Sequence, residues 1–227
     1  MGLLAVPLLI QVGLSPPSAI SVLLMGICIQ TALGTWQTRK AIPVRDTVWA
    51  FIVRAVFIVV GTTVLQFVVT GSVGLFKLMV GVVLCIIVPV QWLWRFEPKD
   101  HLHAAWGWLA FTLSGIMAGI FGMGGPPLVL WVVSQTWPAE RIRGFLFCTF
   151  FLLCPFQLAA LCVAFGPPAI EGIKLGALMI PAVILGSLLG LPIGKRLDPA
   201  RVRLIAYVLL LVIGGQMIFS YFAQRGL

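Results

Sequence analysis

Six long apolar stretches constrain this chain more than any other feature of its sequence. They lie near residues 17–38, 46–70, 74–94, 142–165, 171–193 and 201–223. An α-helix needs about 20 apolar residues to cross the roughly 30 Å hydrocarbon core of a bilayer, so each stretch is long enough to span it. Only 9% of the 227 residues are charged, which leaves too little polar surface for a water-soluble globule. The sequence predicts an all-α polytopic membrane protein with six full transmembrane helices.

Two further apolar segments do not fit this simple pattern. Residues 2–14 are too short to span a bilayer and predict an N-terminal half-helix. They lack the positive region and the cleavage site of a secretory signal, so we expect them to stay in the mature protein. Residues 104–135 are too long for one span and are interrupted by glycine and proline between 122 and 127. We expect this segment to be a broken structure within the membrane.

The basic residues distinguish two arrangements of segment 104–135. If the segment crossed fully, seven Lys and Arg residues would fall on each side, which is no bias. If it enters and returns as a hairpin, only Lys77, Lys174 and Arg225 remain on one side. The other side then holds Arg39, Lys40, Arg45, Arg95, Lys99, Arg141, Arg143, Lys195, Arg196, Arg201 and Arg203. This asymmetry is what the positive-inside rule requires, so the sequence predicts a re-entrant hairpin that opens to the cytoplasm.

The chain also shows a weak internal repeat. The segments 3–40 and 126–165 share a plan, in which a short apolar half-helix and a proline-containing turn precede a full span. Each is followed by two more spans. This predicts one transmembrane domain over residues 1–227, made of two inverted repeats: 1–95, incomplete at its start, and 104–224.

The run Gly119-Ile-Phe-Gly122-Met-Gly124-Gly125-Pro126-Pro127 resembles the GxxGxGG-type signature of the sulfite exporter TauE/SafE family. In that family the signature is repeated near the N-terminus, where this chain shows only a tail, Gly2-Leu-Leu-Ala-Val-Pro7. The resemblance implies a transporter that exports sulfite, sulfoacetate or a related anion across the bacterial inner membrane.

The glycines and prolines of this run have a mechanical use. A half-helix that begins near Pro126 leaves first-turn N–H groups unpaired and points the positive end of its dipole into the protein, where an anion would be attracted. Gly122, Gly124 and Gly125 let the chain turn tightly and approach a small oxyanion. The competing interpretation is that these glycines only permit close helix packing.

Arg54 is the strongest single candidate among the side chains. It lies eight residues beyond Asp46, about 12 Å into a span, where an unpaired charge is costly. The alternatives are a cation whose head group snorkels to the cytoplasmic interface and a partner to a helix C-terminus.

Uncharged polar residues within spans form the third group of candidates. Gln30, Thr31 and Gln157 could donate hydrogen bonds to an oxyanion, and Gln66, Ser114 and Thr149 are weaker candidates. For any one of them, a hydrogen bond to a neighbouring helix is the competing role. The sequence predicts a substrate site from Gly122, Gly124, Gly125, Pro126, Arg54, Gln30, Thr31 and Gln157.

The positions of the other polar residues exclude several function classes. All six acidic residues fall at loops or span ends, so no buried carboxylate offers a proton carrier, and we expect export to be driven by the membrane potential. The five cysteines lie singly, and His101 and His103 are two exposed ligands without a third, so neither a metal nor another cofactor is expected. The basic residues read as topology signals, not as a nucleic-acid surface.

Alternatives to a transporter stay open at this level. A non-transporting subunit of a membrane complex would use the glycine-rich break for packing. An intramembrane enzyme is less favoured because no histidine lies at membrane depth. The expected partners are a small anionic substrate and the lipid bilayer. Whether a second copy of the chain binds to form a homodimer stays open.

Overall fold

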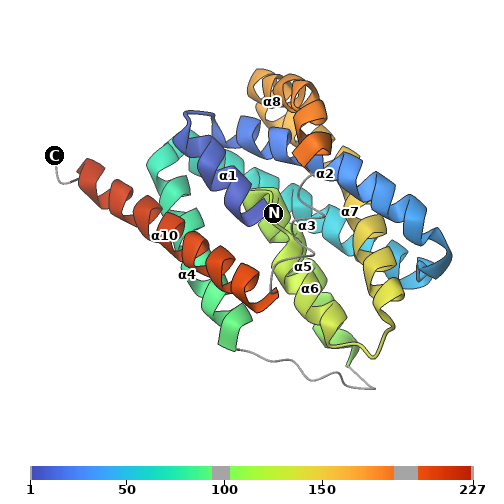
Figure 1. The fold of residues 1–227 in the computed structure, drawn as a ribbon. Helices are drawn as coiled ribbons and strands as arrows, with labels where there is room; N and C mark the ends of the chain where they lie inside the picture. Colours follow the sequence, from blue (N-terminus) through green and yellow to red (C-terminus); the bar gives the residue numbers. More distant parts are fainter. Residues whose placement is uncertain (1, 94–102, 187–198, 226–227) are drawn as a thin grey trace.

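The chain forms a bundle of α-helices in the computed structural model, which describes residues 2–93, 103–186 and 199–225 (Figure 1). No strand occurs in these three ranges, which confirms the predicted all-α class. The elements are α1 (Gly2–Gln11), α2 (Pro16–Thr38), the 3-10 turn η1 (Arg39–Ala41), α3 (Val44–Gly71), α4 (Val73–Leu93), α5 (Ala104–Phe121), α6 (Gly125–Val133), α7 (Ala139–Phe165), α8 (Pro167–Leu178) and α10 (Pro199–Arg225). A short helix, Ile180–Gly186, follows α8.

Six described helices are long and apolar enough to cross a membrane; five of them fall on predicted stretches, and the sixth lies in the broken segment 104–135. Straight candidate spans lie in α2, α3, α4, α5, α7 and α10. The predicted span over 171–193 falls on the helix pair Pro167–Leu178 and Ile180–Gly186, which together are apolar enough for one span and are bent by 50°. Residues 187–193 lie outside the described ranges. Pro181 explains the bend, because proline has no N–H and its ring clashes with the carbonyl four residues earlier.

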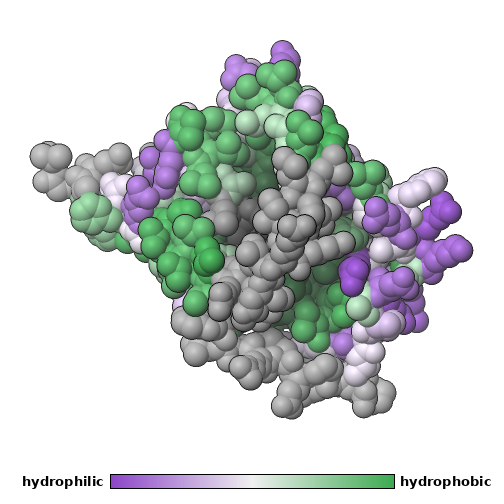
Figure 2. Space-filling model, viewed as in Figure 1, coloured by the Kyte–Doolittle hydropathy of each residue, from purple (hydrophilic) through white to green (hydrophobic). Residues whose placement is uncertain are grey.

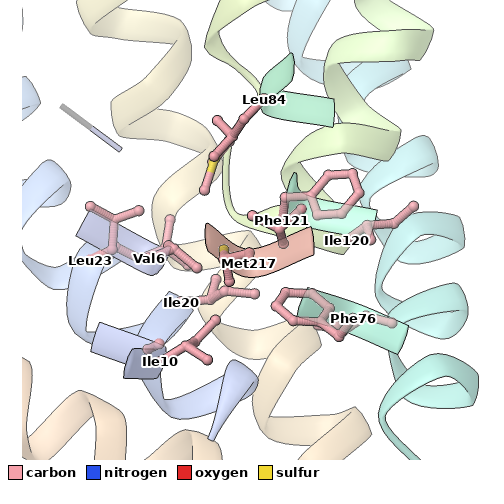
Figure 3. Close-up of a cluster of buried hydrophobic side chains, with 14 of the residues drawn as sticks. Val6, Ile10, Ile20, Leu23, Phe76, Leu84, Ile120, Phe121 and Met217 are labelled. Carbon is pink, nitrogen blue, oxygen red and sulfur yellow. The ribbon is translucent and has the colours of Figure 1, made fainter. Parts of the chain in front are cut away.

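The predicted half-helix over 2–14 is the ten-residue helix α1. Its buried residues Val6 and Ile10 pack in the largest apolar cluster, together with residues of α2, α4, α5 and α10. Figure 3 shows Val6 and Ile10 converging with Ile20, Phe76 and Met217 in this cluster. The cluster anchors a helix that is too short to stand alone.

Segment 104–135 folds back on itself, as the charge distribution predicts. The first arm, α5, is long enough to be a span by itself, and the second arm, α6, packs along it. The ring centroids of Phe111 and Trp131 are 4.8 Å apart, and a Cβ built on Gly107 would lie 3.3 Å from Trp131 Nε1. The end of α6 therefore returns to the level at which α5 begins.

The starts of α3, α5 and α7 meet at one end of the bundle. Arg141 of α7 forms an ion pair with Asp46 of α3 (3.5 Å), and Trp49 of α3 contacts Trp108 of α5, with centroids 5.0 Å apart. We call this the basic end, because it carries Arg39, Lys40, Arg45, Arg141 and Arg143. Figure 2 shows the corresponding hydrophilic side chains at the right of the molecule. The other six residues of the predicted basic side fall outside the part of the chain whose side chains are described.

Candidate functional site

The break between α5 and α6 is a three-residue turn inside the bundle. Gly122 ends α5 in the left-handed conformation, with φ 70°, and its N–H bonds to the Ala118 carbonyl at 2.9 Å. This conformation costs a residue with a Cβ about 1 kcal/mol, so glycine is required here. Helix α6 begins at Gly125, next to Pro126, near which the sequence predicted the start of a half-helix. Pro126 is buried in the first turn and Pro127 follows it.

The prolines limit what the start of α6 can offer to a ligand. The first N–H groups of a helix have no partner within the helix, and two of those positions here hold proline, which has no N–H. Among the residues at the start of α6, only Gly124 and Gly125 therefore have an N–H that could reach a ligand. The macrodipole adds a positive partial charge at this point.

Gly124 is packed too tightly for any side chain. A Cβ built there would lie 2.5 Å from the Ser114 carbonyl oxygen, 2.8 Å from Ala118 Cβ and 2.9 Å from Arg54 Nη2. Real Cβ atoms do not approach backbone that closely. Gly125 is different, because its Cβ would meet only Phe150 Cζ, at 4.0 Å. The two adjacent glycines therefore have different roles: Gly124 permits a close approach and Gly125 begins the helix.

Arg54 is wholly inside the protein. Its relative exposure is 1%, so the snorkelling alternative is wrong. Nε and Nη1 have no hydrogen-bond partner, and no carboxylate within the described residues lies in ion-pair range of the guanidinium. The guanidinium carbon lies 5.0 Å from the centre of the Phe150 ring, a cation–π contact that compensates a small part of the desolvation cost.

The position of Arg54 follows from how closely α3 and α5 pack. Gly61 of α3 and Gly115 and Gly119 of α5 bring the two backbones together, since a Cβ on each would lie within 2.5–2.9 Å of backbone atoms of the other helix. At Gly115 the nearest backbone is that of Arg54 itself. Gly119 thus permits the close packing of α3 against α5, and this packing places Arg54 beside the break.

The predicted amide and hydroxyl donors mostly bond to backbone. Gln157 of α7 donates from Nε2 to the Ala118 carbonyl at 2.6 Å, one turn before the break. Thr31 donates to the Ile27 carbonyl of its own helix at 2.7 Å, and half-buried Gln30 precedes it. The structure thus brings Arg54, Gly124, Gly125 and Gln157 around the break, whereas the described contacts of Thr31 tie it to α2.

Among the weaker candidates, one reaches the break. Ser114, with no exposed surface, donates a short hydrogen bond from Oγ to the Gly124 carbonyl. Gln66 donates to the Ala164 carbonyl and Thr149 to the Phe145 carbonyl of its own helix. Phe150 was missed, because an aromatic residue within an apolar span carries no sequence signal of a polar neighbour. The described residues contain no group of three metal-ligating side chains.

Comparison with known families identifies the same family as the glycine-rich signature. The chain matches the family described as Sulfite exporter TauE/SafE over residues 1–217. It belongs to the TauE/SafE family. This TauE/SafE member is therefore a multi-pass membrane protein of a transporter family, with a small anion as its substrate class. No curated protein and no solved structure matches the chain.

Proposed function

We propose that this protein exports a small sulfur-containing or organic anion, such as sulfite, sulfoacetate or a related sulfonate, across the bacterial inner membrane. The anion binds at the break between α5 and α6, against the Arg54 guanidinium and the amides of Gly124 and Gly125. The protein acts as a transporter and not as an enzyme, and its basic end faces the cytoplasm.

The observation that carries this proposal is the unpartnered buried guanidinium of Arg54. Burying a charge without a partner costs several kcal/mol, so a protein retains such a residue where a ligand completes it. Nε and Nη1 have no partner, and Nη2 lies against Gly124 at the start of α6. An oxyanion there would receive charge-assisted hydrogen bonds from the guanidinium and neutral ones from the amides.

The driving force follows from the charges within the membrane. Asp46, the acidic residue at the start of α3, is partly exposed and paired with Arg141 at the basic end, far from a proton-relay position. A potential of 100 mV, negative inside, favours exit of one negative charge by about 2.3 kcal/mol, or roughly a fifty-fold gradient. Export therefore needs no coupling ion.

The helix contacts support the inverted-repeat organisation. Helix α2 runs in the same direction as α8, with Ser18 beside Gly172 and Met25 beside Gly176. In the same way α3 runs parallel to α7, from the Asp46–Arg141 pair to the hydrogen bond between Gln66 and Ala164. Each pair joins a helix of the first repeat to a parallel helix of the second repeat. A two-fold axis in the membrane plane produces two such pairs with the same geometry.

Reconstituted flux tests the function. The purified protein in liposomes should move sulfite or a sulfonate when a potassium diffusion potential is imposed, with no proton or sodium gradient present. An Arg54→Met variant should lose this flux, because it keeps the volume of the side chain and removes the charge. An Arg141→Met variant, which removes a partly exposed arginine at the basic end, should keep it.

Three outcomes would count against parts of the proposal. Flux that requires a proton or sodium gradient at zero potential would overturn the driving force. Equal flux by the Arg54→Met variant would overturn the site. The absence of flux for every anion, in folded and correctly inserted protein, would favour a non-transporting subunit of a membrane complex.

A further inference from the structure

The Ser114 hydroxyl does not form the hydrogen bond that a buried serine in a helix commonly forms. A buried serine within a helix commonly donates to the carbonyl four residues earlier on its own helix, as Ser134 of α6 does to Leu130 at 2.8 Å. Ser114 donates across the hairpin instead, from α5 to the carbonyl of Gly124. This is a specific connection between the two arms at the point where the chain reverses.

The orientation of one peptide plane depends on this bond. The Gly124–Gly125 peptide is trans, so its carbonyl and its N–H point in opposite directions. With the Gly124 carbonyl held against Ser114, the Gly125 N–H points away from α5 and out of the start of α6. Both residues are glycines, which have a low energetic barrier to other backbone conformations. As the N-cap, Gly124 also offers its carbonyl to the first hydrogen bond of α6, and the Ser114 hydroxyl adds a second contact that ties the same carbonyl to α5.

We infer that Ser114 is a positioning residue of the anion site, which holds the Gly124–Gly125 peptide so that the Gly125 N–H is ready to bind the anion. The inference rests on the proposed function. Ser114 itself does not touch the substrate: its hydroxyl hydrogen is used by the Gly124 carbonyl. Its contribution is to order an amide donor before the anion arrives, which lowers the entropic cost of binding.

The test compares three substitutions in the liposome assay. Ser114→Ala should raise the anion concentration that gives half-maximal flux about tenfold, as expected for a donor worth roughly 1–1.5 kcal/mol. Its maximal flux should stay within twofold of the native value. Ser114→Thr retains the hydroxyl and should recover most of the affinity. Ser134→Ala, the matched control, should change neither quantity.

A second measurement separates binding from folding. The thermal midpoint of the detergent-purified protein should rise on addition of sulfite, and Ser114→Ala should shift the sulfite dependence of this rise to about tenfold higher concentration. If Ser114→Ala lowers maximal flux at unchanged half-saturation, or if Ser114→Thr does not recover affinity, Ser114 is only structural and the inference is wrong. If the native protein neither moves nor is stabilised by any anion, the proposed function fails instead.

Discussion

Arg54 Nη2 of α3 lies against Gly124, the residue that precedes α6, where even a methyl group would come within 2.9 Å of it. These residues are 70 positions apart in the chain. Their contact joins a buried positive charge to the positive end of a helix, and no carboxylate in the described ranges offsets either. These two like electrostatic features at membrane depth are the basis for the proposal that an anion binds beside them.

Arg54→Met should weaken anion binding by at least about tenfold without lowering the stability of the empty protein. The guanidinium contributes charge-assisted hydrogen bonds to the anion, but in the empty protein its Nε and Nη1 are buried without partners. The measurement is the thermal midpoint with and without sulfite. A large drop in midpoint without ligand would mean that Arg54 has a structural role.

Gly124→Ala should destabilise the protein by about 1–3 kcal/mol, because the new methyl group would overlap the Ser114 carbonyl and Ala118. Gly125→Ala is the matched comparison, since its Cβ would have only an ordinary contact with Phe150. Thermal unfolding of the two variants should therefore differ. Equal midpoints would contradict the tight turn described for the break.

Gly119→Ala should also lower the thermal midpoint, by an amount that corresponds to about 1–3 kcal/mol. Its Cβ would lie 2.5 Å from the Ile58 carbonyl oxygen and 2.7 Å from the Thr62 nitrogen, so α3 and α5 would be forced apart. Gly215→Ala on α10 serves as the control, because no atom lies within 4 Å of its Cβ position. It should leave the midpoint unchanged or raise it slightly.

The basic end should face the cytoplasm. In a cysteine-free background, Lys40→Cys and Arg143→Cys should react with a membrane-impermeant maleimide only after the cells are opened. Ser72→Cys, in the exposed turn between α3 and α4, should react in intact spheroplasts. The reverse pattern would invert the topology that the positive-inside rule predicts.

The sequence contained enough to predict the hairpin and the position of Arg54 deep within a span. Counting basic residues was sufficient because loop charge biases the side on which a loop lies, whatever the helices contact. The bend within the predicted span 171–193 was not predicted, because hydropathy averages over a window and does not register how Pro181 interrupts a helix.

The sequence by itself determined that this chain lives in a bilayer, where its broken segment returns and which family it belongs to, since these depend on composition, loop charge and a contiguous motif. The tertiary structure decided which polar groups meet. Gln157 bonds to backbone near the break and Thr31 to its own helix, while Ser114 and Phe150 contact the residues of the site. A hydrogen bond or a ring contact requires atoms to lie a few ångströms apart, and only the packing of α3, α5 and α7 sets those distances.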